Sequence, residues 1–86
     1  MDDSIIIREF EKLAHRMDIA IRHTAGGPDG LCTIKGGHVL FIDKTLDKRS
    51  KIEVFVREFR TLDFEGFFVV PVIRRLLGLE DEEADW

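Results

Sequence analysis

The stretch LCTIKGGHVLFID at residues 31–43 decides the fold of this chain. Two short apolar runs flank the pair Gly36-Gly37, and a two-residue glycine turn between such runs is typical of a β-hairpin. We therefore expect strands over residues 31–35 and 38–43. Successive side chains of a strand point to opposite faces, so one face of this hairpin is wholly apolar. We expect that face to lie against the core, and it consists of Cys32, Ile34, Val39 and Phe41.

The opposite face of the hairpin is expected to remain uncovered. A turn at Gly36-Gly37 places Ile34 opposite Val39, and the residues between them alternate accordingly. The uncovered face then mixes apolar with polar side chains, and an exposed apolar patch on a sheet favours association. We expect a homodimer built on the apolar members of this face, which are Leu31, Leu40 and Ile42.

Two elements and a loop precede the hairpin. Residues 4–17 have apolar side chains at helical spacing, with Asp3 or Ser4 placed to cap the first amides. Residues 19–24 are a β-branched run that favours a strand. Residues 25–30 combine three glycines with a proline, which predicts a loop.

Two helices are expected after the hairpin. Asp47 is a suitable N-cap for the first, whose apolar stripe leaves Val54 on the opposite face. Pro71 suits the first turn of a second, short helix that ends at Gly78. The stripe of the first helix consists of Ile52, Phe55, Val56, Phe59 and Leu62.

This order of elements predicts the α+β class, with a small antiparallel sheet made of a strand and a β-hairpin and with helices packed on one face. We expect a single domain over residues 1–79. Residues 80–86 carry five acids and little apolar content, so we expect an acidic, mobile tail.

Composition narrows the classes of function. The 86 residues carry a net charge of −4, which argues against a dedicated nucleic-acid binder. No apolar run approaches the length of about 18 residues that a membrane span needs. The amino terminus is acidic, unlike that of a signal peptide, and a single cysteine excludes an internal disulfide. We therefore expect a small soluble domain in the cytoplasm.

The histidines and the cysteine do not predict a metal site. His15, His23 and His38 do not stand at zinc-ligand spacing with one another or with Cys32, so we expect no metal and no cofactor. Cys32 is expected to behave as a small buried hydrophobe. The glycine-rich loop at 25–30 leaves room for a ligand, and a cysteine-based enzyme or sensor with His23 or His38 beside Cys32 is an alternative.

A basic cluster follows the hairpin. It is suited to an acidic partner or to nucleic acid, although such a run is more often a solvated face. Its members are Lys44, Lys48, Arg49 and Lys51.

Residues 13–62 resemble the amino-terminal half of the ImmA/IrrE family of small zinc metallopeptidases. The order of elements matches, with Gly30-Leu31-Cys32, the strand residues 39–43 and Leu46 at comparable places. Residues 55–62 fall where that family has a helix bearing H-E-x-x-H. The resemblance implies a related fold over just over half of the chain.

The zinc-ligand motif is lost from this helix. Arg57 and Thr61 stand at the two histidine positions, and only Glu58 retains the residue of the family. Two histidines one helical turn apart would hold Zn²⁺, and the glutamate would act on a zinc-bound water. The permanent positive charge of Arg57 repels Zn²⁺, so we expect this chain not to catalyse the reaction of the resembled family.

We therefore expect a non-catalytic protein-interaction domain that resembles a degenerate metallopeptidase and binds a protein partner not identified by the sequence. No self-consistent catalytic set is present in the sequence, so we do not expect an enzyme. The residues expected to form its binding surface are Val54, Arg57, Glu58, Thr61, Lys44, Lys48, Arg49 and Lys51.

Overall fold

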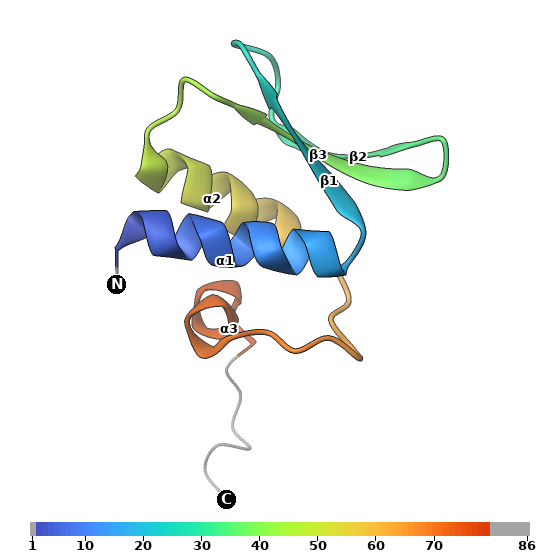
Figure 1. Cartoon of the computed structure of the whole chain (residues 1–86), viewed down its shortest axis with the longest axis vertical. Helices are drawn as coiled ribbons and strands as arrows, with labels where there is room; N and C mark the ends of the chain where they lie inside the picture. Colours follow the sequence, from blue (N-terminus) through green and yellow to red (C-terminus); the bar gives the residue numbers. More distant parts are fainter. Residues whose placement is uncertain (1, 80–86) are drawn as a thin grey trace, which may run out of the picture.

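Three helices and three strands make up the computed structural model of this chain, which describes residues 2–79 (Figure 1). The α+β class expected from the sequence is confirmed. The predicted acidic tail at residues 80–86 lies outside the described residues. In chain order the elements are α1 (Asp3–Arg16), β1 (Ile19–Thr24), β2 (Gly30–Ile34), β3 (Gly37–Asp43), α2 (Lys48–Phe59) and α3 (Pro71–Leu77).

Local sequence signals set the ends of the helices. Asp47 caps α2 as predicted, because its carboxylate accepts a hydrogen bond of 2.8 Å from the backbone N–H of Ser50. The cap of α1 is Asp2, one residue before the two candidates expected from the sequence, and it accepts from the N–H of Ser4. Pro71 begins α3, and Gly78 ends it with a φ of 76° that favours glycine.

The sheet is mixed, with strand order β1-β3-β2. β3 pairs antiparallel with β2 but parallel with β1, so the expectation of a wholly antiparallel sheet is wrong in this respect. Residues 25–29 carry the chain from β1 across the carboxyl end of β3 to β2. The Asp43 carboxylate accepts from the N–H of Gly26 at 3.2 Å, and the Asp43 N–H donates to Asp29 Oδ1 at 2.8 Å. These two bonds hold the crossing loop in place.

The turn of the hairpin is one residue earlier than predicted. Lys35 and Gly36 have φ values of 53° and 83°, as the two central residues of a tight hairpin turn require. Cys32 therefore pairs with Val39, and Leu31 pairs with Leu40. The register differs by two residues from the predicted one, so the same side chains still share each face.

The buried face of the hairpin is the reverse of the predicted one. Leu40 and Ile42 are 0% and 1% exposed, whereas Ile34 is 46% exposed and Cys32 is also exposed. The predicted dimer residues Leu31, Leu40 and Ile42 therefore belong to the core side of the sheet.

The parallel pairing with β1 explains this reversal. It aligns Ile21 with Leu40 and Leu31 across all three strands, and it aligns the smaller Ala20 with Val39 and Cys32 on the other face. Burial of the row with the larger aliphatic side chains removes more apolar surface from water.

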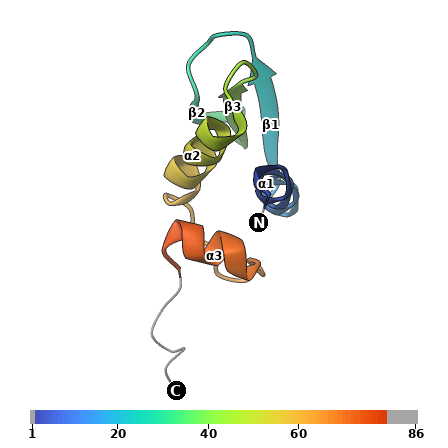
Figure 2. The ribbon, with the colours of Figure 1, turned by 90° about the vertical axis from the view of Figure 1, so that its left-hand side faces the viewer.

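The helices form two layers below the sheet. α1 and α2 lie side by side against the strands, and α3 packs on these two helices (Figure 2). Phe10 of α1 stacks on Phe55 of α2 with ring centroids 4.9 Å apart, and Phe59 meets Phe10 edge to face at 5.4 Å. No helix within residues 2–79 is long and apolar enough to cross a membrane.

Val54 is buried at 4% exposure, so its predicted place on a binding surface is wrong. α2 packs against the sheet, against α1 and against α3, and such a helix is buried around more of its circumference than a single stripe.

Candidate functional site

Glu58 joins α2 to the edge of the sheet. Its Oε1 atom accepts a hydrogen bond of 3.1 Å from the backbone N–H of Leu31 in β2. Its Oε2 atom accepts from Arg57 Nε at 2.8 Å. Thr61 Oγ1 donates to the backbone carbonyl of Glu58 at 2.7 Å. The three residues at the position of the resembled zinc helix thus lie together, with each of them in a hydrogen bond.

These contacts keep the Glu58 carboxylate ionised. The hydrogen bond from Arg57 lowers the pKa of Glu58, and the Leu31 amide lowers it further, while partial burial opposes both. A general base at neutral pH works best with a pKa close to the working pH. Glu58 is therefore suited to fastening α2 to β2 and poorly suited to proton transfer.

Cys32 and the histidines do not converge. Cys32 projects from the outer face of the sheet beside Val39. His23 pairs with Ile42, and His38 pairs with Ile19 and Thr33, so alternation places both histidines on the helix side of the sheet, opposite Cys32. Within residues 2–79 no group of three or more histidine, cysteine, aspartate or glutamate side chains could hold a metal ion.

The predicted basic cluster is divided in the structure. Lys48 and Lys51 line a cleft of about 220 Å³ between α1 and α2, together with His23 of β1. Arg49 does not line this cleft and forms an ion pair of 3.4 Å with Asp3. Lys44 is exposed just beyond the end of β3. The four cations therefore do not line one common site.

A groove between α2 and α3 brings some of the predicted residues together with others. We call it the arginine groove, and its volume is about 540 Å³. Its lining combines three aliphatic side chains with three arginines and one acid from the exposed side of α2. The lining residues are Arg49, Ile52, Glu53, Val56, Arg57, Arg60 and Leu76.

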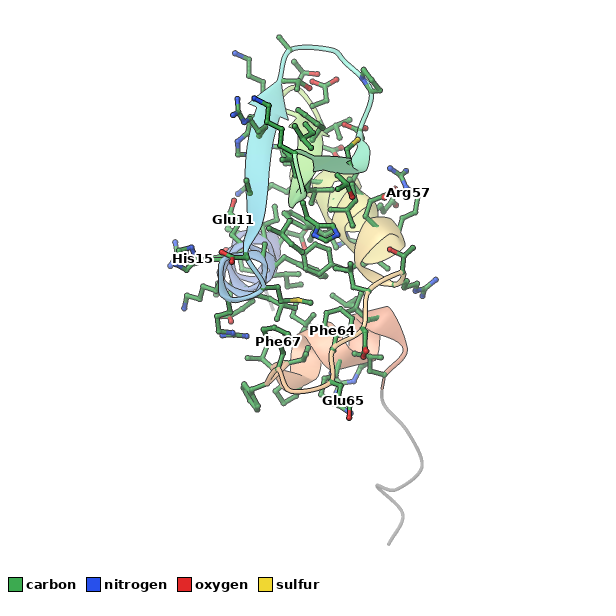
Figure 3. The ribbon with its side chains drawn as sticks, turned by 90° about the vertical axis from the view of Figure 1, so that its right-hand side faces the viewer. Glu11, His15, Arg57, Phe64, Glu65 and Phe67 are labelled. Atoms are coloured by element: carbon green, nitrogen blue, oxygen red, sulfur yellow. The ribbon has the colours of Figure 1, made fainter. Side chains whose placement is uncertain are left out.

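The arginines of this groove face solvent. The Arg49 and Arg57 side chains are 74% and 58% exposed, and each uses its Nε atom in the ion pair described above. The terminal nitrogens of a guanidinium remain able to bind a carboxylate in a bidentate manner. Figure 3 shows Arg57 extending outward from α2.

Sequence reasoning missed Arg60, Glu53 and Leu76 as members of this site. Arg49, Glu53, Arg57 and Arg60 recur every three or four residues, which places them on one face of a helix, and this signal was present in the sequence. Leu76 could not be assigned, because only the packing of α3 brings it to α2.

The outer face of the sheet is a second uncovered surface. Its side chains are small or apolar apart from Arg22 and Asp43, and no helix within residues 2–79 packs on it. The apolar members of this face are Ala20, Cys32, Ile34, Val39 and Phe41. Comparisons with protein-family models, with curated proteins and with solved structures find no match to this chain.

Proposed function

We propose that this chain is a non-catalytic protein-interaction domain, which resembles a degenerate metallopeptidase and binds an acidic segment of a partner protein in the arginine groove. The observation that carries the proposal is the aliphatic floor of Ile52, Val56 and Leu76 beside three arginines. Grooves of this kind accept the apolar side chains of an amphipathic segment. Arginine supplies the matching planar donors for carboxylates at its rim.

The state of Glu58 supports a role without catalysis. Both of its carboxylate oxygens already accept hydrogen bonds, from Leu31 and from Arg57. Arg57 also stands where the resembled family has its first zinc ligand, and a guanidinium does not bind a cation. The glutamate that would carry the chemistry is thus used to join α2 to the sheet.

A protein partner fits the charges better than nucleic acid does. The chain has a net charge of −4, and Glu53 lies among the arginines of the groove. A phosphate backbone favours a continuous basic surface, whereas Lys48 and Lys51 line the cleft beside α1 and Arg49 lines the arginine groove. We further propose that the protein acts in the cytoplasm, where its single cysteine would stay reduced.

A thiol-based sensor is the second candidate. The exposed side chain of Cys32 on the outer face of the sheet favours it. His23 and His38 lie on the other face, so the proposal includes no histidine base. Such a sensor would act by oxidation or modification of Cys32 alone.

Titration of the protein with a fluorescent acidic peptide that carries leucine and phenylalanine tests the leading proposal. Arg60→Glu reverses the charge of an exposed groove residue and is expected to weaken binding by about tenfold or more. Lys44→Glu is the matched control, because it makes the same change at an exposed cation outside the groove. Equal losses in the two variants would contradict the site, and tighter binding to single-stranded DNA than to the peptide would contradict the class of partner.

A further inference from the structure

β1 is an edge strand, and within residues 2–79 no other strand pairs with its outer side. Among the described strands it is bonded to β3 alone, and the carbonyl of Thr24 accepts from the N–H of Lys44 at 2.8 Å. The N–H and C=O of one strand residue point to the same side, and neighbouring residues alternate. Ala20, Arg22 and Thr24 therefore face β3. The residues that direct their backbone groups to the free edge are Ile19, Ile21 and His23.

The two edge strands of the sheet, β1 and β2, differ in how well they are protected from pairing with another chain. At the β2 edge, the N–H of Leu31 is already bound by the Glu58 carboxylate at 3.1 Å. Along β1, a groove of about 280 Å³ exposes the edge and is lined by Glu11 and His15 of α1. Proteins usually protect an edge strand with proline, lysine or a covering segment, because an open edge pairs readily with another chain. β1 contains neither proline nor lysine.

We propose that a second copy of this chain pairs with β1 in the antiparallel direction and forms a two-fold dimer with a continuous six-stranded sheet. A two-fold axis at Ile21 sets His23 of one copy opposite Ile19 of the other. The three edge residues of each copy can then exchange up to about six backbone hydrogen bonds. The outer rows of Ala20, Val39 and Cys32 join into one apolar surface across the axis.

The flanking helix favours a second copy over an unrelated strand. α1 leads directly into β1, so His15 lies near the Ile19 end of the groove. Glu11, one turn earlier, also lines the cleft that contains His23, which places it near the other end. Figure 3 shows Glu11 and His15 extending from α1 beside β1. Antiparallel pairing about Ile21 therefore sets Glu11 of one copy beside His15 of the other.

Sedimentation equilibrium at tens of micromolar tests the dimer with two variants at one position. His23→Pro removes an N–H that faces away from β3 and has no partner among residues 2–79 of the single chain, and it puts a ring into the free edge. His23→Ala is the matched control, since it removes the same exposed imidazole and keeps the N–H. We expect the mass of a dimer for the wild type and for His23→Ala, and the mass of one chain for His23→Pro with an unchanged circular dichroism spectrum.

A charge exchange on α1 decides the question if the proline variant does not fold. Glu11→Lys is expected to weaken dimerisation by about tenfold, and addition of His15→Glu is expected to restore it. A wild-type protein that stays monomeric overturns the proposal. A folded His23→Pro variant that dimerises like the wild type also overturns it, and so does a charge exchange that leaves the dimer unaffected.

Discussion

Truncation of Leu40 to alanine tests which face of β3 is the core. Leu40 is fully buried, in the row that joins Ile21 and Leu31 across the sheet. Leu40→Ala removes three carbon groups, whose transfer from water is worth about 2.4 kcal/mol at about 0.8 kcal/mol each. A residual cavity of about 40 Å³ adds about 1 kcal/mol. We expect the free energy of unfolding to fall by about 3–4 kcal/mol.

Val39→Ala is the matched control on the same strand. Val39 is the adjacent residue, is only half-buried and points to the outer face, so we expect a loss below about 1 kcal/mol. Urea unfolding followed by far-ultraviolet circular dichroism measures both variants. At about 1 kcal/mol per molar urea, the midpoint moves by about 3 M for Leu40→Ala and by less than about 1 M for Val39→Ala.

The order of the two losses decides the result. A Leu40→Ala variant that is unfolded even without urea agrees with the core assignment, because small domains are stable by only about 5 kcal/mol. A larger loss for Val39→Ala than for Leu40→Ala would refute it and would place the row of Cys32 and Val39 in the core.

Three further predictions concern the α2 site and the thiol. Because the hydrogen bond from Arg57 lowers the pKa of Glu58, the carboxylate stabilises the fold fully above about pH 4.5, the ordinary pKa of a glutamate, and this contribution is lost as the pH falls through the lowered value. Urea unfolding of wild type and Glu58→Gln should therefore differ at neutral pH and converge in acid, and a constant difference would contradict the contacts of Glu58. Cys32 is exposed, so a thiol reagent should modify the native protein nearly as fast as the unfolded protein, whereas strong protection would place Cys32 in the core. Purified protein should hold no stoichiometric zinc, since Arg57 and Thr61 replace the histidines of the resembled motif, and elemental analysis with about one zinc per chain would overturn this expectation.

Local signals in the sequence predicted the elements well. The periodicity of residues 4–17, the cap at Asp47 and the proline and glycine that bound α3 each depend on side chains within one or two helical turns. The hairpin at residues 31–43 likewise depends on its own turn and its own apolar runs. Such interactions can be predicted from the local sequence, because the interacting residues are close together along the chain and meet in any tertiary fold.

Part of the candidate site could also be predicted from the sequence. Arg49 and Arg57 were expected at a binding surface, and the same helical spacing extends to Arg60. Val54 was misplaced, because a single stripe describes a helix with one covered side, whereas α2 is covered by the sheet and by two helices. The number of neighbours around a helix is a property of the whole fold.

The sequence alone determined that residues 2–79 form three helices, three strands and a tight hairpin, because those choices follow from side chains close together along the chain. Only the tertiary structure decided that β1 runs parallel to β3, that Leu40 and not Val39 is buried, and that Glu58 binds β2. Each of these depends on partners distant in sequence, and the Leu31 amide lies 27 residues from the Glu58 carboxylate. Each face of the hairpin carries several apolar side chains, and the parallel addition of β1 made the face of Leu31, Leu40 and Ile42 the larger apolar surface to bury.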